Sequence, residues 1–304
     1  NIYMIQKLTG IILFFYLFLL SGIIHEEEIN IPFQGITLNG NLELSQNKSV
    51  TDGVILIIHG TLAHRGMEIT SALQNLLKDN GVNTLAINLS YSIDNRSGMY
   101  DCKNLHKHKH TDALSEISAW IDYLKKRDVK KIILLGHSRG GNQAAWFASQ
   151  NDDPAIKSAI LVAPMTWDEK SVAENYKKRY KKDLQPLLEK AQKLIKSGKG
   201  DTVLTHTDFL YCEDTSVTAE AFAGYYASDK KMDTPFLIPQ IKKPVFLAIA
   251  KNDTVIPDLI EKASALSDNK TVHIKVFEMA DHFFRDLNAE ELAEEIAGFL
   301  KEKL

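Results

Sequence analysis

The chain has 304 residues, of which 44% are hydrophobic, 25% charged and 9% aromatic, close to the average of soluble globular proteins. These proportions exclude a disordered chain, a collagen and a polytopic membrane protein. With 36 basic and 39 acidic residues the net charge is -3, so no overall basic field is available to hold a nucleic acid. Two cysteines are too few for a disulfide-rich scaffold or a structural zinc site.

The N-terminal segment departs from this average. It begins at Leu8, ends at Ile24 and has no charged residue over its 17 positions, with Lys7 before it and three glutamates soon after it. A basic residue followed by an apolar stretch is typical of a secretory signal, whereas a membrane-spanning helix needs about 20 apolar residues. A cleaved signal, an uncleaved membrane anchor and a buried helix of the fold are the alternatives. We expect residues 1–28 to direct export to the periplasm or the extracellular space.

After residue 28, short apolar runs alternate with longer segments of helical spacing, the pattern of an α/β protein. Residues 29–33 and 36–44 predict an edge hairpin. Residues 54–58 are wholly apolar, as in a parallel strand that is buried on both faces. Further strands are predicted at 82–89, 132–135, 159–162, 245–250 and 272–277, and helices at 67–80, 111–127, 139–150, 257–267 and 289–302. We therefore expect a doubly wound, mostly parallel sheet.

The alternation breaks at residues 165–241, where polar sequence of helical character separates two predicted strands. We expect these residues to form a helical cap that is inserted between two parts of one core, residues 29–164 and 242–304. Within the cap, residues 170–199 contain ten Lys or Arg and three acids, a local net charge of +7. Such a run usually forms a solvated helix face, and attraction to an acidic substrate or a membrane surface is the alternative.

One motif carries a nucleophile. The strand at 132–135 runs directly into residues 136–140, which read G-H-S-R-G, and a predicted helix follows. This is the G-x-S-x-G pattern in the strand, turn and helix context of a nucleophile elbow. Side chains at the two glycine positions would collide with the neighbouring strand and helix. We expect the Ser138 hydroxyl to be exposed at the carboxyl edge of the sheet, and a plain tight turn is the alternative.

A serine hydroxyl needs a base, and the base needs a carboxylate that fixes its tautomer. His282 follows the last predicted strand through a short loop, so it reaches the same edge of the sheet as Ser138. Asp253 comes directly after the strand at 245–250. We expect Ser138 to be the nucleophile, His282 the general base and Asp253 the carboxylate. A surface histidine and a turn aspartate are the alternatives.

Acyl transfer also needs hydrogen-bond donors for the oxyanion that develops on the carbonyl oxygen. Residues 58–61 end an apolar strand, so backbone N–H groups there can face the nucleophile. We expect the amides of Thr61 and Arg139 to form the oxyanion hole, and a structural turn at 59–60 is the alternative. We expect neither a cofactor nor a metal ion.

Two further features have open interpretations. Cys102 and Cys212 could pair in an oxidising compartment and join the cap to the core, and two buried free thiols are the alternative. His106, His108 and His110 alternate with lysines. Three histidines could bind a metal, but a solvated strand or turn suits this lysine-rich loop better.

With these residues the chain resembles the α/β-hydrolase superfamily, in particular the serine-hydrolase branch that includes monoacylglycerol lipases and serine aminopeptidase-like enzymes. Residues 59–64 read H-G-T-L-A-H and are similar to that branch's H-G-x-G-E-H, and residues 136–141 read G-H-S-R-G-G and are similar to its G-H-S-x-G-G. The chain order of serine, aspartate and histidine is that of the superfamily's triad. The resemblance covers about residues 29–304.

Three positions depart from the branch's pattern. Leu62 and Ala63 stand where it has Gly and Glu, and Arg139 stands where Met or Leu is common. These departures bear on the substrate and leave the triad intact. The resemblance implies a serine hydrolase that cleaves a small-molecule carboxylic ester, and less readily an amide, through an acyl-enzyme. An acyltransferase of the same fold and a non-catalytic binding protein are the alternatives.

Overall fold

A computed structural model of the chain describes residues 26–303. The segment for which the sequence predicts export or anchoring, from Leu8 to Ile24, lies outside the described residues. Within residues 26–303, none of the helices combines the length and the apolar character needed to cross a membrane.

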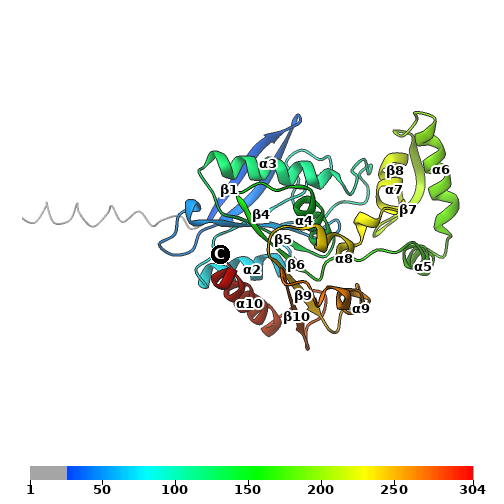
Figure 1. Ribbon diagram of the computed structural model, residues 1–304. Helices are drawn as coiled ribbons and strands as arrows, with labels where there is room; N and C mark the ends of the chain where they lie inside the picture. Colours follow the sequence, from blue (N-terminus) through cyan, green and yellow to red (C-terminus); the bar gives the residue numbers. More distant parts are fainter. Residues whose placement is uncertain (1–25, 304) are drawn as a thin grey trace, which may run out of the picture.

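The centre of the molecule is one eight-stranded sheet (Figure 1). Its strands are β1 (Glu26–Phe33), β2 (Ile36–Glu43), β3 (Val54–Ile58), β4 (Thr84–Ile87), β5 (Ile132–His137), β6 (Ile156–Val162), β9 (Val245–Ala250) and β10 (Val272–Phe277). They lie in the order β1-β2-β4-β3-β5-β6-β9-β10. The β1–β2 hairpin is antiparallel and pairs antiparallel with β4, while all the other neighbours are parallel. The predicted doubly wound, mostly parallel sheet is confirmed.

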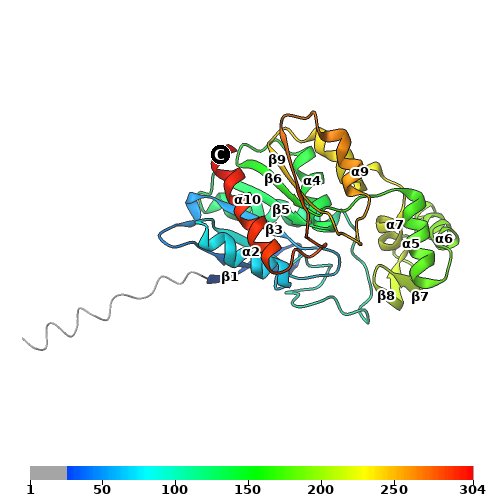
Figure 2. The same cartoon turned by 90° about the horizontal axis from the view of Figure 1, so that it is seen from below.

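Helices cover both faces of the sheet, which explains the wholly apolar central strands. The core helices are α2 (Glu68–Asp79), α3 (Asp112–Lys126), α4 (Arg139–Gln150), α9 (Leu259–Ala263) and α10 (Leu287–Lys303), with short 3-10 turns at Val50–Asp52 and Ser264–Leu266. Ile55 and Ile57 of β3 pack in one cluster with α2 and α10. Leu56 and Ile58 pack in the other with α3 and α4. Figure 2 shows α2 and α10 together on one face.

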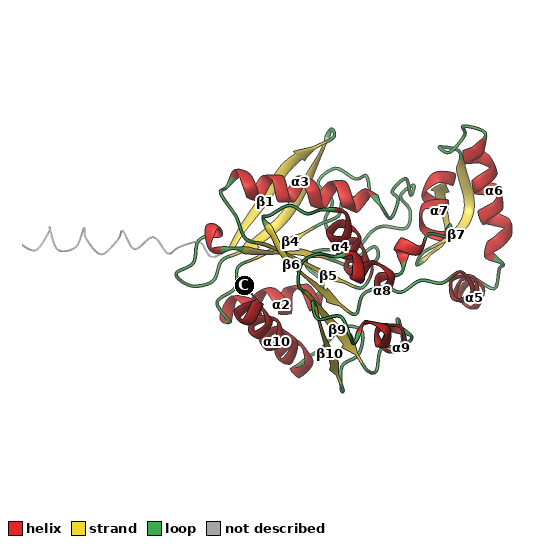
Figure 3. Cartoon of the chain, in the orientation of Figure 1, coloured by secondary structure: helices red, strands yellow, loops and turns green. Residues whose placement is uncertain are grey.

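Between β6 and β9 the chain leaves the sheet and forms a separate lobe, residues 163–244, which we call the insertion (Figure 3). Its elements are α5 (Glu169–Tyr180), α6 (Leu184–Lys196), β7 (Val203–Phe209), β8 (Cys212–Thr218), α7 (Ala219–Tyr226), α8 (Thr234–Leu237) and 3-10 turns at Lys230–Met232 and Ile238–Gln240. The expectation of a purely helical segment is wrong, because β7 and β8 form an antiparallel hairpin. Two register shifts interrupt their pairing, so the sequence lacks the alternation that identifies a strand.

The insertion is tied covalently to the core. A disulfide joins Cys102, in the loop between β4 and α3, to Cys212 at the start of β8. Hydrogen bonds extend this contact: Thr215 Oγ1 donates to the Cys102 carbonyl at 2.6 Å, and the His106 amide donates to the Ser216 carbonyl at 2.9 Å. The loop therefore runs along the hairpin and anchors it.

The three alternating histidines in this loop are buried, so the expected solvated strand or turn is wrong. His106, His108 and His110 each expose 1% or less of their surface, packing around the rings of Phe209 and Tyr225. The alternation reflects a segment with one inward face, since the lysines between them lie further out. Burial lowers the pKa of His106 to about 4 and, with the charge of Arg139, that of His110 to about 3. Among residues 26–303 there is no group of three or more metal-ligating side chains that could hold an ion.

Candidate active site

Ser138 lies at the sharp turn between β5 and α4 with φ 57° and ψ -122°, a left-handed conformation that is strained for any residue but glycine. The flanking glycines make this turn possible. A Cβ at Gly136 would lie 2.1 Å from the Gly140 carbonyl oxygen, and one at Gly140 would lie 2.4 Å from the His59 carbonyl oxygen. The Ser138 amide donates to the Val162 carbonyl at 3.0 Å. The turn thus fixes Ser138 at the carboxyl end of the central strands.

Asp253 and His282 come together at the same edge of the sheet. Asp253 follows β9 and His282 lies in the loop between β10 and α10, and a 2.7 Å contact joins His282 Nδ1 to Asp253 Oδ2. Both side chains are buried. Asp253 Oδ1 also accepts the amides of Val255 at 2.7 Å and Ile256 at 2.8 Å. Burial alone would raise the pKa of Asp253, but the His282 contact and these amides lower it below the usual value.

His137 positions the backbone beneath His282. Its Nε2 donates to the His282 carbonyl at 2.8 Å, and the two rings lie 4.8 Å apart. Burial lowers the pKa of His137 to about 3, so its ring stays neutral. Ser138 and His282 line one pocket. Within the described chain no hydrogen bond joins the Ser138 hydroxyl to the His282 ring. In the absence of substrate, the hydrogen bond between nucleophile and base is often long, and it shortens when substrate binds.

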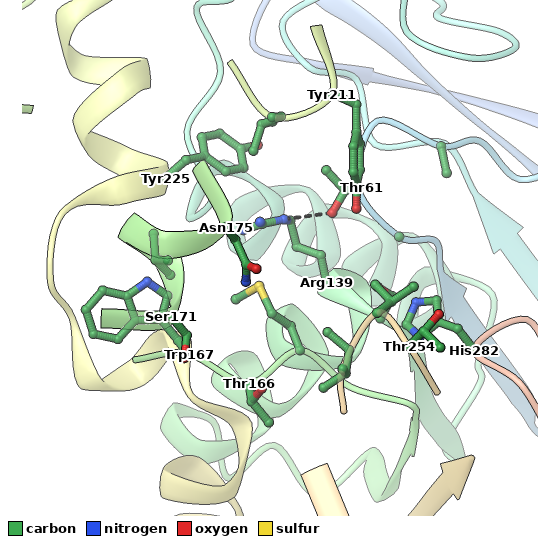
Figure 4. Close-up of a pocket in the computed structure, with 18 of the residues that line it drawn as sticks. Thr61, Arg139, Thr166, Trp167, Ser171, Asn175, Tyr211, Tyr225, Thr254 and His282 are labelled. Carbon is green, nitrogen blue, oxygen red and sulfur yellow. Dashed lines mark hydrogen bonds between the residues drawn. The ribbon is translucent and has the colours of Figure 1, made fainter. Parts of the chain in front are cut away.

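The loop after β3 faces Ser138 closely. A Cβ at Gly60 would lie 3.3 Å from Ser138 Cβ, a tight contact, so glycine at position 60 eases the close approach of this backbone to Ser138. The amides of Thr61 and Arg139 have no hydrogen-bond partner in the part of the chain that the structure covers. The Thr61 hydroxyl accepts from Arg139 Nε at 2.9 Å, which joins the two residues (Figure 4).

His59 has a structural role in this loop. The Leu89 amide donates to His59 Nε2 at 3.0 Å, so Nδ1 carries the proton and donates to the Gly60 carbonyl at 2.9 Å. Burial and the charge of Arg96 lower the pKa of His59 to about 3. The neutral ring therefore holds the Gly60 peptide in place.

A pocket of about 990 Å³ opens above Ser138 between the sheet and the insertion. Its wall includes Trp167, Tyr211 and Tyr225 from the insertion (Figure 4). Sequence reasoning gave these residues no role. The available signal was composition, since five of the ten tyrosines of the chain lie between positions 176 and 226. Aromatic side chains at such density favour a binding surface.

Comparison with solved structures identifies the architecture. Est1E from Butyrivibrio proteoclasticus, solved with ferulic acid bound, has a TM-score of 0.64 and 22% identity over 90% of this chain and 98% of that one. A monoacylglycerol lipase from Paleococcus ferrophilus has a TM-score of 0.61 and 18% identity over 88% and 99%. An esterase from Pyrococcus furiosus has a TM-score of 0.60 and 18% identity over 91% of each chain.

A family described as the alpha/beta hydrolase fold matches residues 53–194. The chain has the α/β-hydrolase fold. No curated protein sequence shows a significant match to this chain. The identities to the solved structures are all low, so these likenesses establish the shared fold.

Leu62 stands where the branch that the sequence resembles has glycine, and the structure shows how the residue is accommodated. Leu62 has φ 53°, in the left-handed region that glycine adopts freely, and its side chain is buried. Its amide donates to the hydroxyl of Tyr91 at 3.0 Å, which also donates to the Gly60 carbonyl at 3.2 Å. These two hydrogen bonds with Tyr91 thereby hold residue 62 in a left-handed backbone conformation that is unfavourable for leucine.

Proposed function

We propose that the protein is a serine hydrolase that cleaves a carboxylic ester, and less readily an amide, through an acyl-enzyme. The observation that supports this most strongly is the buried His282–Asp253 contact beside a pocket that Ser138 also lines. A nucleophile at a strained turn, a base and an orienting carboxylate in one cleft are the parts that acyl transfer needs.

The proposed mechanism has two halves. Ser138 Oγ attacks the ester carbonyl carbon as His282 Nε2 takes the hydroxyl proton, and Asp253 accepts from Nδ1 and stabilises the imidazolium. The negative carbonyl oxygen is bound by the free amides of Thr61 and Arg139, each worth about 10²–10³ in turnover. His282 then protonates the leaving alcohol. In the second half it activates a water molecule that releases the acid from Ser138.

Ester substrates are favoured by the structural neighbours. One holds ferulic acid, one is named an esterase and one a monoacylglycerol lipase. A pocket of about 990 Å³ with an aromatic wall has the size and lining of a small-molecule site.

The proposal is tested with p-nitrophenyl esters from acetate to long acyl chains. The purified wild-type protein is expected to hydrolyse at least part of this series, with a Ser138→Ala variant at background. Absence of turnover across the whole series by folded wild-type protein would count against an esterase. Product analysis with a competing alcohol separates hydrolysis from acyl transfer.

We also propose that the enzyme is exported, either released or held at the membrane by the segment from Leu8 to Ile24. The disulfide between Cys102 and Cys212 supports an oxidising compartment. Mass spectrometry of the protein from fractionated cells tests both points. A mature N-terminus near residue 28 indicates release, an intact segment in the membrane fraction indicates an anchor, and recovery of the intact chain in the cytosol contradicts export.

A further inference from the structure

The Arg139 side chain extends from the residue after the nucleophile into the pocket, where three neighbours fix it. Its Nε donates to Thr61 Oγ1 at 2.9 Å and its Nη1 donates to His110 Nδ1 at 3.2 Å. The guanidinium carbon lies 5.0 Å from the centre of the Tyr225 ring (Figure 4). The guanidinium is therefore oriented before any substrate arrives.

The contact with His110 is itself determined by a chain of hydrogen bonds. The Asn142 side-chain amide donates to the Lys231 and Met232 carbonyls, both at 3.0 Å, which leaves its Oδ1 as the acceptor facing His110. His110 Nε2 donates to that oxygen at 2.7 Å, so Nδ1 bears the lone pair and accepts from Arg139. His110 stays neutral because burial and the charge of Arg139 lower its pKa to about 3.

All the fixed partners of Arg139 are neutral. Across residues 26–303, no carboxylate oxygen lies within 4.0 Å of its guanidinium, and Nη2 makes no hydrogen bond. Three acidic residues line the pocket, Asp168, Glu174 and Asp258, and each has another partner. Glu174 pairs with Lys170 at 3.8 Å. Asp168 accepts the Ser171 amide at 2.8 Å at the start of α5, and Asp258 accepts from Thr166 Oγ1 at 2.6 Å and pairs with Lys262 at 3.3 Å.

A second arginine near the active site shows what a structural role looks like. Arg96 is buried and donates to the carbonyls of Leu89, Gly98 and Ala63 at 2.6 to 2.8 Å, with His59 as a further neighbour at 3.1 Å. All three nitrogens of its guanidinium contact the protein. In Arg139, by contrast, Nε and Nη1 donate to protein groups, while Nη2 is free in the described part of the chain and the side chain lines the pocket.

We propose that Arg139 binds a carboxylate of the substrate, so that the preferred esters carry a negative charge close to the scissile carbonyl. This rests on the proposed function and names its substrate class. A planar guanidinium with free N–H groups matches a carboxylate bidentately. The lining of the pocket is balanced in formal charge, with Arg139, Lys178 and Arg179 against Asp168, Glu174 and Asp258. The basic run that borders it supports an anionic substrate, because residues 170–199 carry a net charge of +7.

The test compares charged and neutral esters of the same shape. On the acyl side, p-nitrophenyl hemiglutarate is paired with p-nitrophenyl pentanoate, and on the alcohol side, 3-acetoxybenzoate is paired with 3-methylphenyl acetate. We expect wild-type enzyme to prefer the charged member of at least one pair by about 10- to 100-fold in kcat/KM, the worth of a hydrogen bond to a charged group. The pair that shows the preference locates the carboxylate on the acid or on the alcohol.

Variants separate Arg139 from the general positive charge of the insertion. Arg139→Met is expected to reduce the charged-to-neutral ratio to about one, and Arg139→Lys to keep part of it, because lysine retains the charge but not the fork. Lys193→Met removes an exposed charge of α6 outside the pocket and serves as the matched control, with an unchanged ratio. A ratio near one in wild-type enzyme, or an unchanged ratio in Arg139→Met, overturns the inference.

Two further measurements keep the inference testable apart from activity and from the folding of the variant. Ser138→Ala protein is titrated calorimetrically with monomethyl glutarate and with neutral dimethyl glutarate, and tighter binding of the anion is expected even if no ester is hydrolysed. The charged preference of wild-type enzyme is expected to shrink as salt is raised. Equal binding of the two glutarates contradicts the proposed carboxylate site but does not contradict the proposed serine hydrolase activity.

Discussion

The sheet and the insertion contribute to the active site in different ways. The sheet supplies Ser138, Asp253 and His282 from the ends of buried parallel strands, with backbone positions fixed by close packing. The insertion supplies the aromatic wall of the pocket and carries the basic run at 170–199. We infer that the core determines the reaction and, through Arg139 of α4, part of the choice of substrate, while the insertion shapes the rest of the pocket.

The largest effect is expected in the sheet. Asp253→Asn keeps the shape of the side chain but removes the charge that orients His282, so kcat/KM is expected to fall about 10⁴-fold for every ester. Asp281→Asn is the matched control, because Asp281 is adjacent to His282 but pairs with Arg285 at 2.7 Å instead. Steady-state kinetics on short and long esters measures both. Similar losses in the two variants would contradict the assigned carboxylate.

The disulfide tests how far the insertion depends on the core. The Cys102→Ser, Cys212→Ser double variant opens a loop of 110 residues, and the free energy of unfolding is expected to fall by up to about 4 to 5 kcal/mol. Urea unfolding with and without reductant measures this. Reductant is expected to lower the midpoint of the wild-type protein and to leave the variant unchanged. If reductant leaves the urea midpoint of the wild-type protein unchanged, noncovalent contacts alone hold the insertion on the core.

Acid is expected to destabilise the region where the loop, the insertion and the sheet meet. Burial lowers the pKa to about 3 for His59, His110 and His137 and to about 4 for His106, against about 6.5 in an unfolded chain. Below pH 6.5 the unfolded chain binds more protons than the folded one, so the free energy of unfolding decreases as the pH is lowered. Each histidine contributes at most about 1.4 kcal/mol per pH unit.

Glu116 acts in the opposite direction. Burial raises its pKa to about 7 despite two hydrogen bonds from Ser90, so its contribution to stability grows as pH falls from 7 toward the unfolded value. The stability gained from this one carboxyl offsets the stability lost from one of the histidines. The free energy of unfolding is therefore still expected to decrease as the pH is lowered. Urea unfolding at pH 7.5, 6 and 5 checks the sign. Constant or rising stability toward pH 5 would contradict buried neutral histidines.

The smallest effect is expected at Thr61. A substitution there distinguishes a role of the backbone amide from a role of the side-chain hydroxyl. Thr61→Val keeps the amide and removes the acceptor of the Arg139 Nε hydrogen bond, so kcat/KM for neutral esters is expected to fall less than about 10-fold. The same ester series measures it. A loss above about 100-fold would mean that the hydroxyl itself takes part in the reaction.

The same division between sheet and insertion explains what the sequence predicts. The predicted ranges 54–58, 245–250 and 272–277 coincide with β3, β9 and β10. Apolar runs between turn signals define such strands locally. The elbow is equally local, since its glycines, strand and helix are contiguous.

Features that depend on distant partners could not be predicted in this way. The β7–β8 hairpin has interrupted pairing, and the inward face of the loop with His106 depends on packing against Phe209. The orientation of Arg139 rests on hydrogen bonds through His110 to Asn142, and His110 comes from the loop before α3 while Arg139 and Asn142 both lie on α4. Only the fold brings these side chains together.

The central claim is that Ser138 is a nucleophile activated by His282. The most direct measurement is labelling of the folded wild-type protein with a fluorophosphonate probe, followed by peptide mass spectrometry. The account predicts a single adduct on Ser138, none on the same peptide of Ser138→Ala, and much slower labelling of His282→Ala. An adduct on a different residue, or equal labelling of the Ser138→Ala protein, would contradict it.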